Sequence, residues 1–124
     1  MTTRRPYALA LALIVGLGAA TVPLLAHMQA TKMAPAADAT VAASPAQVEV
    51  WFSQEPDPKL SKLEVSGASG AVKLKPIQIT KNMSIVAAID GTLADGRYMV
   101  RWQSAGDDGH VQKGEYAFSV KNTR

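Results

Sequence analysis

The segment Asp107-Asp108-Gly109-His110 brings a carboxylate and an imidazole to nearby positions of the chain. Residues two apart in an extended loop project to the same side, so Asp108 and His110 can face one metal ion. Gly109 between them adds no side chain that would crowd the ion. Asp-Asp-Gly is also an ordinary composition for a hairpin turn, so this segment alone is a weak indication of a metal site.

His27 is the other of only two histidines, and it follows a segment with the pattern of a secretory signal. Arg4 and Arg5 supply the positive charge at its start. Residues 8–20 are apolar and uncharged, and residues 23–26 form a candidate cleavage region.

We therefore expect residues 1–26 to be a cleaved signal peptide and residues 27–124 to form the mature domain. Two alternatives remain at this point. The cut could fall after Ala30, which would remove His27. The apolar stretch over residues 7–26 is also nearly long enough to span a bilayer, so the signal could be retained as an anchor.

A cut after Ala26 would give His27 a free α-amine beside its imidazole, and the two nitrogens can close a chelate ring on a metal. The α-amine has an ordinary pKa of about 7.7–8.0, so metal competes with one weakly held proton at neutral pH. Together with Asp108 and His110, the possible metal-donor atoms are three nitrogens and one oxygen. Such a set suits one Cu(II) per chain in tetragonal geometry, whereas zinc would prefer a tetrahedral arrangement. Spacing alone does not bring His27 near the other two residues.

Composition narrows the class of protein. The chain has no cysteine, which excludes disulfides, thiolate metal sites and cysteine nucleophiles. Removing residues 1–26 leaves 98 of the 124 residues, enough for one small domain. Arg4 and Arg5 carry two of the three net positive charges, so the remainder carries about +1. Nucleic-acid binding needs a clustered basic face, so no nucleic-acid partner is expected.

From Gln47 onward, apolar and polar residues alternate with a period of two, which is typical of half-buried strands. The clearest strands are expected at Arg97–Trp102 and Gly114–Val120. Shorter candidates lie at residues 28–33, 47–52, 60–65, 71–74, 77–79 and 83–89. The alanine- and proline-rich connection before Gln47 is expected to be an irregular loop. About seven short strands separated by turn signals predict an all-β fold, an antiparallel β-sandwich.

The apolar members of these strands form the expected core: Val48, Val50, Phe52, Leu63, Val65, Ile77, Ile79, Ile85, Val100, Trp102 and Phe118. The dispersed methionines Met28, Met33, Met83 and Met99 form no Met-x-x-Met run. We interpret them as core or surface residues rather than as thioether ligands for Cu(I).

Several motifs follow one another in a fixed order along residues 27–121. They begin with His27 and include Phe52-Ser53 and Pro58-Lys59-Leu60-Ser61. They are densest near the end, with Gly96-x-Tyr98-x-Val100-x-Trp102, Asp108-Gly109-His110, Gly114 and Tyr116-x-Phe118-x-Val120. This ordered combination resembles the periplasmic copper-resistance proteins of the CopC type.

The resemblance implies an immunoglobulin-like β-sandwich or Greek-key barrel with a Cu(II) site. By this resemblance, His27 supplies its amine and ring, Asp108 a carboxylate, and His110 a second ring. Members of the family often have serine where Gly106 stands and proline where Val111 stands, which bears on loop rigidity and affinity. The chain lacks the methionine-rich loop of members that also bind Cu(I), which favours Cu(II) alone.

The function predicted is therefore that of a periplasmic Cu(II)-binding protein, not an enzyme, that acts on no small-molecule substrate. It would sequester copper or deliver it to an inner-membrane copper transporter of the CopD type or to another acceptor. The main alternative is an immunoglobulin-like accessory domain that binds no metal. A copper monooxygenase acting on polysaccharides is disfavoured, because Asp108 would fill a coordination position that such chemistry needs open.

Overall fold

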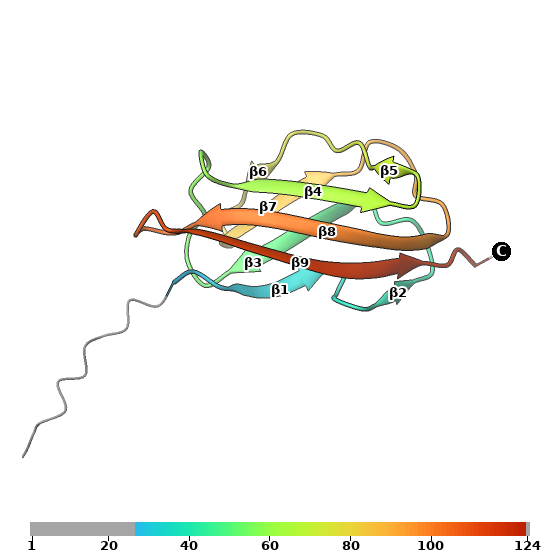
Figure 1. Cartoon of the computed structure of the whole chain (residues 1–124), viewed down its shortest axis with the longest axis horizontal. Helices are drawn as coiled ribbons and strands as arrows, with labels where there is room; N and C mark the ends of the chain where they lie inside the picture. Colours follow the sequence, from blue (N-terminus) through green and yellow to red (C-terminus); the bar gives the residue numbers. More distant parts are fainter. Residues whose placement is uncertain (1–26, 124) are drawn as a thin grey trace, which may run out of the picture.

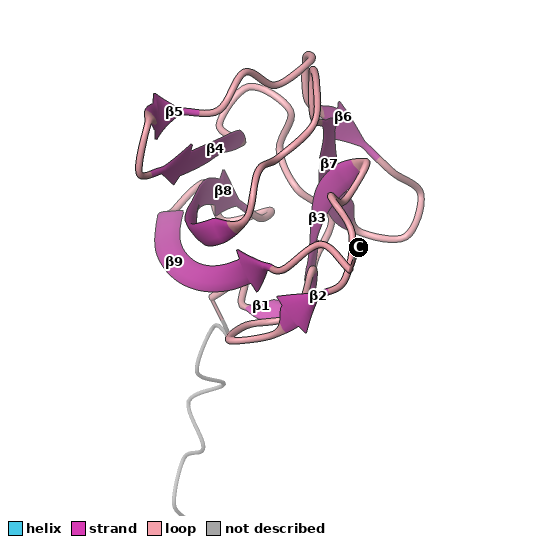
Figure 2. Ribbon diagram, turned by 90° about the vertical axis from the view of Figure 1, so that its right-hand side faces the viewer, coloured by secondary structure: helices cyan, strands magenta, loops and turns pink. Residues whose placement is uncertain are grey.

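The computed structural model describes residues 27–123, so the predicted signal peptide lies outside the described residues. Strands, turns and loops make up this part of the chain, and it contains no helix long and apolar enough to cross a membrane. The strands form two sheets that pack face to face, as the end-on view shows (Figure 2).

The first sheet has four strands in the order β1-β3-β7-β6. They are β1 (Ala30–Ala34), β3 (Gln47–Phe52), β7 (Ser84–Ala88) and β6 (Gln78–Ile79). All neighbours in this sheet are antiparallel. Because β1 pairs with β3, the beginning of the described chain is attached to the sheet rather than free of it.

The second sheet has five strands in the order β2-β9-β8-β4-β5. They are β2 (Thr40–Val41), β9 (Val111–Val120), β8 (Gly96–Ala105), β4 (Lys62–Gly67) and β5 (Gly70–Ala71). The short β2 runs parallel to β9, and the remaining neighbours are antiparallel. The long β8–β9 hairpin dominates this sheet, and its turn lies at the same end of the sandwich as the start of β1 (Figure 1).

The core lies between the sheets, and its composition follows from the alternation along each strand. In β3, Val48, Val50 and Phe52 are buried while the residues between them are only partly covered. Residues from both sheets fill the interior, and the buried cluster comprises Met28, Val48, Val50, Phe52, Leu63, Val65, Ile85, Ala87, Ile89, Leu93, Tyr98, Val100, Tyr116, Phe118 and Val120. The predicted core is thus confirmed, with Ile77, Ile79 and Trp102 packed at its margin as half-buried residues.

The all-β sandwich predicted from the sequence is confirmed, with differences in detail. Nine strands form within residues 27–123, compared with the seven or so expected. The strand expected at 60–65 begins at Lys62, and the one expected at 71–74 is reduced to β5, with Leu74 making only an isolated bridge to Ile89.

Strand β2 was not expected, because it lies in the connection predicted to be an irregular loop. It forms because the backbone of this connection finds partners along β9. Asp38 N donates to Ala117 O at 2.7 Å, and Ser119 N donates to Ala39 O at 2.8 Å. The partner strand is distant in sequence, so local composition carries no signal for this pairing.

Candidate metal centre

Asp108 and His110 lie on the five-residue connection of the β8–β9 hairpin, beyond its last pair, Ala105 and Val111. The backbone closes a turn there, with Gly109 N donating to Gly106 O at 3.1 Å. Gly109 has a φ of 71°, in the left-handed region that glycine enters without steric cost. The turn reverses the chain so that Asp108 and His110 face the same side.

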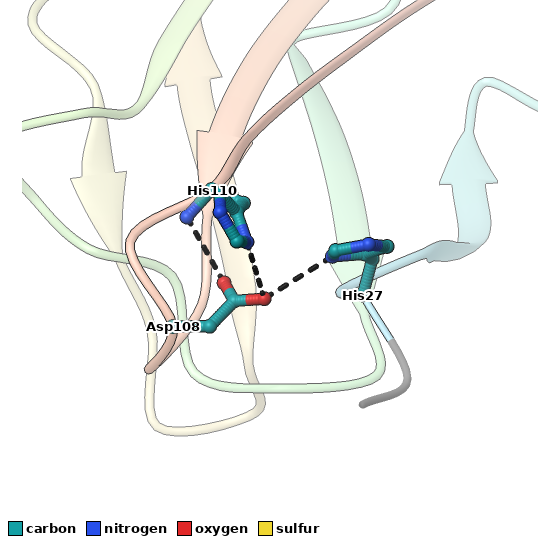
Figure 3. Close-up of side chains that lie close together, drawn as sticks. All are labelled: His27, Asp108 and His110. Atoms are coloured by element: carbon teal, nitrogen blue, oxygen red, sulfur yellow. Dashed lines mark hydrogen bonds and ion pairs between the residues drawn. The ribbon is translucent and has the colours of Figure 1, made fainter. Parts of the chain in front are cut away.

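The carboxylate of Asp108 is held by its own loop. His110 N donates to Asp108 Oδ1 at 3.0 Å, the pattern of an Asx turn. This bond orients one oxygen toward the backbone and leaves Oδ2 directed at the two imidazoles (Figure 3).

His27 reaches the site from the other end of the described chain. Its neighbour Met28 is buried in the core with 2% of its surface exposed. Gln29 is bonded twice to Ser53, its N donating to Ser53 Oγ at 3.0 Å and its O accepting from Ser53 N at 2.9 Å. These contacts direct the His27 side chain toward the β8–β9 turn, although the side chain itself is 54% exposed.

The three side chains converge on one point. His27 Nδ1 lies 3.1 Å from Asp108 Oδ2, and His110 Nδ1 lies 3.2 Å from the same oxygen (Figure 3). The two imidazole rings are 5.3 Å apart between centroids and meet edge to face at 74°. One ligand atom from each residue lies within 4.8 Å of the others.

The surroundings of Asp108 favour its ionised form. Its pKa is lowered, chiefly by the hydrogen bond from the His110 backbone, and further by the side chains of His110 and His27. Partial burial opposes this shift, since the Asp108 side chain is only 21% exposed. The site therefore presents a carboxylate anion to the two imidazoles at neutral pH.

These distances fit coordination of a divalent metal. A metal bonded to imidazole nitrogen and carboxylate oxygen at about 2.0–2.1 Å holds neighbouring ligands in a square arrangement about 2.9 Å apart. The observed separations between Asp108 Oδ2 and the two Nδ1 atoms are close to that value. An ion could therefore bind with small movements of exposed side chains.

The structure also assigns positions to residues that the sequence analysis did not single out as part of the site. They lie in the connection between β3 and β4. Asp57 and Ser61 contact the end of β8, and Gln54 contacts Asp107 in the turn beyond it. These residue types are common in loops, so the sequence did not indicate that they contact the candidate site. Of the three, only Ser61 lies in a motif that carries the resemblance to the CopC type, Pro58-Lys59-Leu60-Ser61.

A β-sandwich that brings two histidines and one aspartate together at one end defines the class of this domain, and comparison with known proteins narrows the class. The profile of the CopC domain matches residues 30–121, and the chain belongs to this family. The matched range contains Asp108 and His110 and begins just after His27.

Two relatives from Escherichia coli illustrate the similarity. Protein YobA of strain K12 is 31% identical over 100 residues, which cover 77% of this chain and 80% of that protein. Copper resistance protein C is 32% identical over 108 residues, which cover 78% of this chain and 83% of that protein.

Two crystal structures share the fold. PcoC, a methionine-rich copper resistance protein from Escherichia coli, superposes with a TM-score of 0.70 at 28% identity, covering 77% of this chain and all of that one. CopC from Methylosinus trichosporium OB3b gives a TM-score of 0.70 at 29% identity, covering 79% of this chain and 97% of that one.

Proposed function

We propose that this protein binds one Cu(II) ion between His27, Asp108 and His110, and that it sequesters or carries copper outside the cytoplasm. Membership of the CopC domain family and relatives named for copper resistance support copper as the metal. The observation that carries the site is the position of Asp108 Oδ2, which lies 3.1 Å and 3.2 Å from two histidine nitrogens.

The donor set favours Cu(II) over other divalent ions. Imidazole and carboxylate donors suit copper in tetragonal geometry, and the divalent affinity series peaks at copper. His27 directs Nδ1 toward the site, and this is the ring nitrogen that closes the smaller chelate ring with its own α-amine. The fourth donor in this proposal is that amine, which requires cleavage after Ala26.

The site suits a carrier better than a catalyst. Both histidine side chains are more than half exposed, at 54% for His27 and 68% for His110, so an acceptor has direct access to the ion. A transporter of the CopD type in the inner membrane is the acceptor we propose, with the periplasm as the compartment. Asp108 occupies a coordination position that oxygen activation would need open.

The intact mass of the exported protein, measured with and without one equivalent of Cu(II), tests this proposal. We expect a chain that starts at His27 and gains the mass of one copper ion. In a chain starting at Met1, the α-amine of His27 would be part of a peptide bond and could not bind the metal. A chain starting at Thr31 would lack His27 altogether. Either result, or a correctly processed chain that takes up no copper, would favour the accessory domain that binds no metal.

A thermal unfolding series separates the two functions independently. A ligand that binds only the folded state stabilises it by about 2.7 kcal/mol at a hundredfold excess over its dissociation constant. We therefore expect saturating Cu(II) to raise the melting temperature of the processed protein. An accessory domain without a metal site would melt at the same temperature with and without copper.

A further inference from the structure

We propose that the connection between β3 and β4, residues 53–61, is the positioning element of the copper site, and that the buried Ser61–Ser104 hydrogen bond anchors it. This inference rests on the proposed function, since it concerns how that site is held. We name residues 53–61 the bridging loop, because it contacts both halves of the site. None of its residues lies among the proposed ligands.

The first half of the bridging loop holds the segment that carries His27. Ser53 exchanges two hydrogen bonds with Gln29, one through its backbone N at 2.9 Å and one through its Oγ at 3.0 Å. Gln29 is two residues from His27. The start of the bridging loop thus fixes the direction in which the chain approaches the site.

The middle of the bridging loop holds the segment that leads to Asp108. Asp57 N donates to Ala105 O at 2.9 Å, and Asp107 N donates to Gln54 Oε1 at 3.4 Å. The side chain of Pro56 is fully buried, so this part of the bridging loop is seated in the fold rather than lying free on the surface. Backbone groups immediately before Asp108 are therefore tied to the same loop that holds Gln29.

The end of the bridging loop is fastened by a buried pair of hydroxyls. Ser61 Oγ donates to Asp57 O at 2.6 Å and lies 2.7 Å from Ser104 Oγ. A hydroxyl has a single proton, and a carbonyl can only accept, so Ser104 must donate to Ser61. Ser61 and Ser104 are 7% and 0% exposed, which leaves water little access to replace either partner.

This direction of donation makes the two serines unequal. Ser104→Ala removes one donor, while Ser61 keeps its bond to the Asp57 carbonyl. Ser61→Ala instead removes the acceptor of a fully buried hydroxyl. It also removes the shorter of the two hydrogen bonds that the Asp57 carbonyl accepts, and leaves the one from Leu60 N at 3.2 Å. Leaving a buried donor unsatisfied costs more than removing both partners of a bond. We therefore expect Ser61→Ala to loosen the loop more than Ser104→Ala does.

Amide hydrogen exchange of the metal-free protein tests the positioning without copper. We expect Ser61→Ala to accelerate exchange at Asp107 and His110 by about tenfold or more, since local opening governs exchange. Ser84→Ala is the matched control, because Ser84 is also fully buried and donates to Glu49 Oε2, but lies in the other sheet. Equal acceleration at these amides in both variants, or none in Ser61→Ala, overturns the inference.

Copper titration with electron paramagnetic resonance supplies the second readout. Loss of groups that orient metal ligands typically weakens affinity about 10–100-fold, and we expect Ser61→Ala to fall in this range with altered copper hyperfine splitting. Ser61→Thr, which keeps the hydroxyl, should restore both, and Ser84→Ala should leave both unchanged.

The two readouts separate failure of this inference from failure of the proposed function. A wild-type protein that binds no copper refutes the proposed function, while hydrogen exchange still decides whether the bridging loop holds the 107–110 segment. Wild-type copper binding with unchanged affinity and spectrum in Ser61→Ala refutes the positioning role alone. If Ser61→Ala does not fold, hydrogen exchange and copper titration are measured on Ser104→Ala instead. We then expect faster exchange and weaker copper binding than in the wild type, with smaller changes than those expected for Ser61→Ala.

Discussion

At the scale of single residues, Asp108 is the centre of the candidate metal site. One oxygen accepts from its own loop, and the other lies against both histidines. A carboxylate in this position can neutralise part of the charge of a bound cation and can also align two imidazoles that come from distant parts of the chain.

We predict that Asp108→Asn lowers the affinity for Cu(II) by more than the roughly 10–100-fold typical of losing a group that merely orients a ligand. The amide is nearly the same size but is neutral and a poorer metal donor. Isothermal titration calorimetry against Asp107→Asn measures the effect, because that control makes the same charge change at the neighbouring exposed residue. Similar losses in both variants would mean that general charge, not coordination, governs binding.

At the scale of elements, two strand ends create the site. The β8–β9 turn presents Asp108 and His110, and the segment before β1 presents His27. Neither element would be positioned without the core beneath it, since Met28 is 2% exposed and Trp102 packs edge to face on Phe52 at 5.1 Å.

We predict that Met28→Ala lowers the free energy of unfolding by about 2–5 kcal/mol, the usual cost of removing a large buried side chain. Met83→Ala, at a methionine that is 44% exposed, should change it by about 0.5 kcal/mol or less. Urea denaturation of the metal-free proteins measures both. Equal costs at the two positions would contradict the burial of Met28.

We predict that Gly114→Ala destabilises the domain by about 1–3 kcal/mol, as overpacking of a filled space does. Gly114 pairs with Trp102 across the β8–β9 hairpin, and an added methyl group would overlap the indole ring. In a Trp102→Leu background the same substitution should cost less, because the smaller side chain leaves room. Additive effects in this double-mutant cycle would show that the ring is not the obstacle.

At the scale of the whole molecule, the ends of the described chain are tied to the fold. Close to the C-terminus, Asp95 Oδ1 accepts from Asn122 N at 2.8 Å and from Asn122 Nδ2 at 2.7 Å. These bonds lower the pKa of Asp95, the backbone bond most and the side-chain bond next, and the charge of Lys121 adds to them.

A carboxyl group whose pKa is lower in the folded state stabilises the fold at pH values above its unfolded pKa. This contribution is lost as the pH falls through the lowered, folded pKa. We therefore predict that Asp95→Asn reduces the free energy of unfolding near neutral pH, and that the difference from the wild type shrinks on acidification below about pH 4. Denaturant unfolding across this range measures it, and a difference independent of pH would refute the role of ionisation.

The sandwich and its core could be predicted from local pattern. In a strand, successive side chains point to opposite faces, so alternation in 47–52, 97–102 and 114–120 marks the buried face whatever the partner strand is. The meeting of Asp108 with His110 is also local, but it comes from a turn with Gly109 at a φ of 71° rather than from the extended loop that the sequence analysis assumed. The family motifs added to these local signals the expectation that the metal is copper.

The meeting of His27 with Asp108 was decided by tertiary structure alone, because the two residues are 81 positions apart. Likewise, neither the parallel pairing of β2 with β9 nor the burial of Ser61 against Ser104 has a signature in neighbouring residues. Such contacts depend on the register of strands and the packing of two sheets, which are collective properties of the whole domain. The sequence by itself therefore determined which residues alternate and which side chains can bind a metal. The folded sheets decided which of those side chains meet.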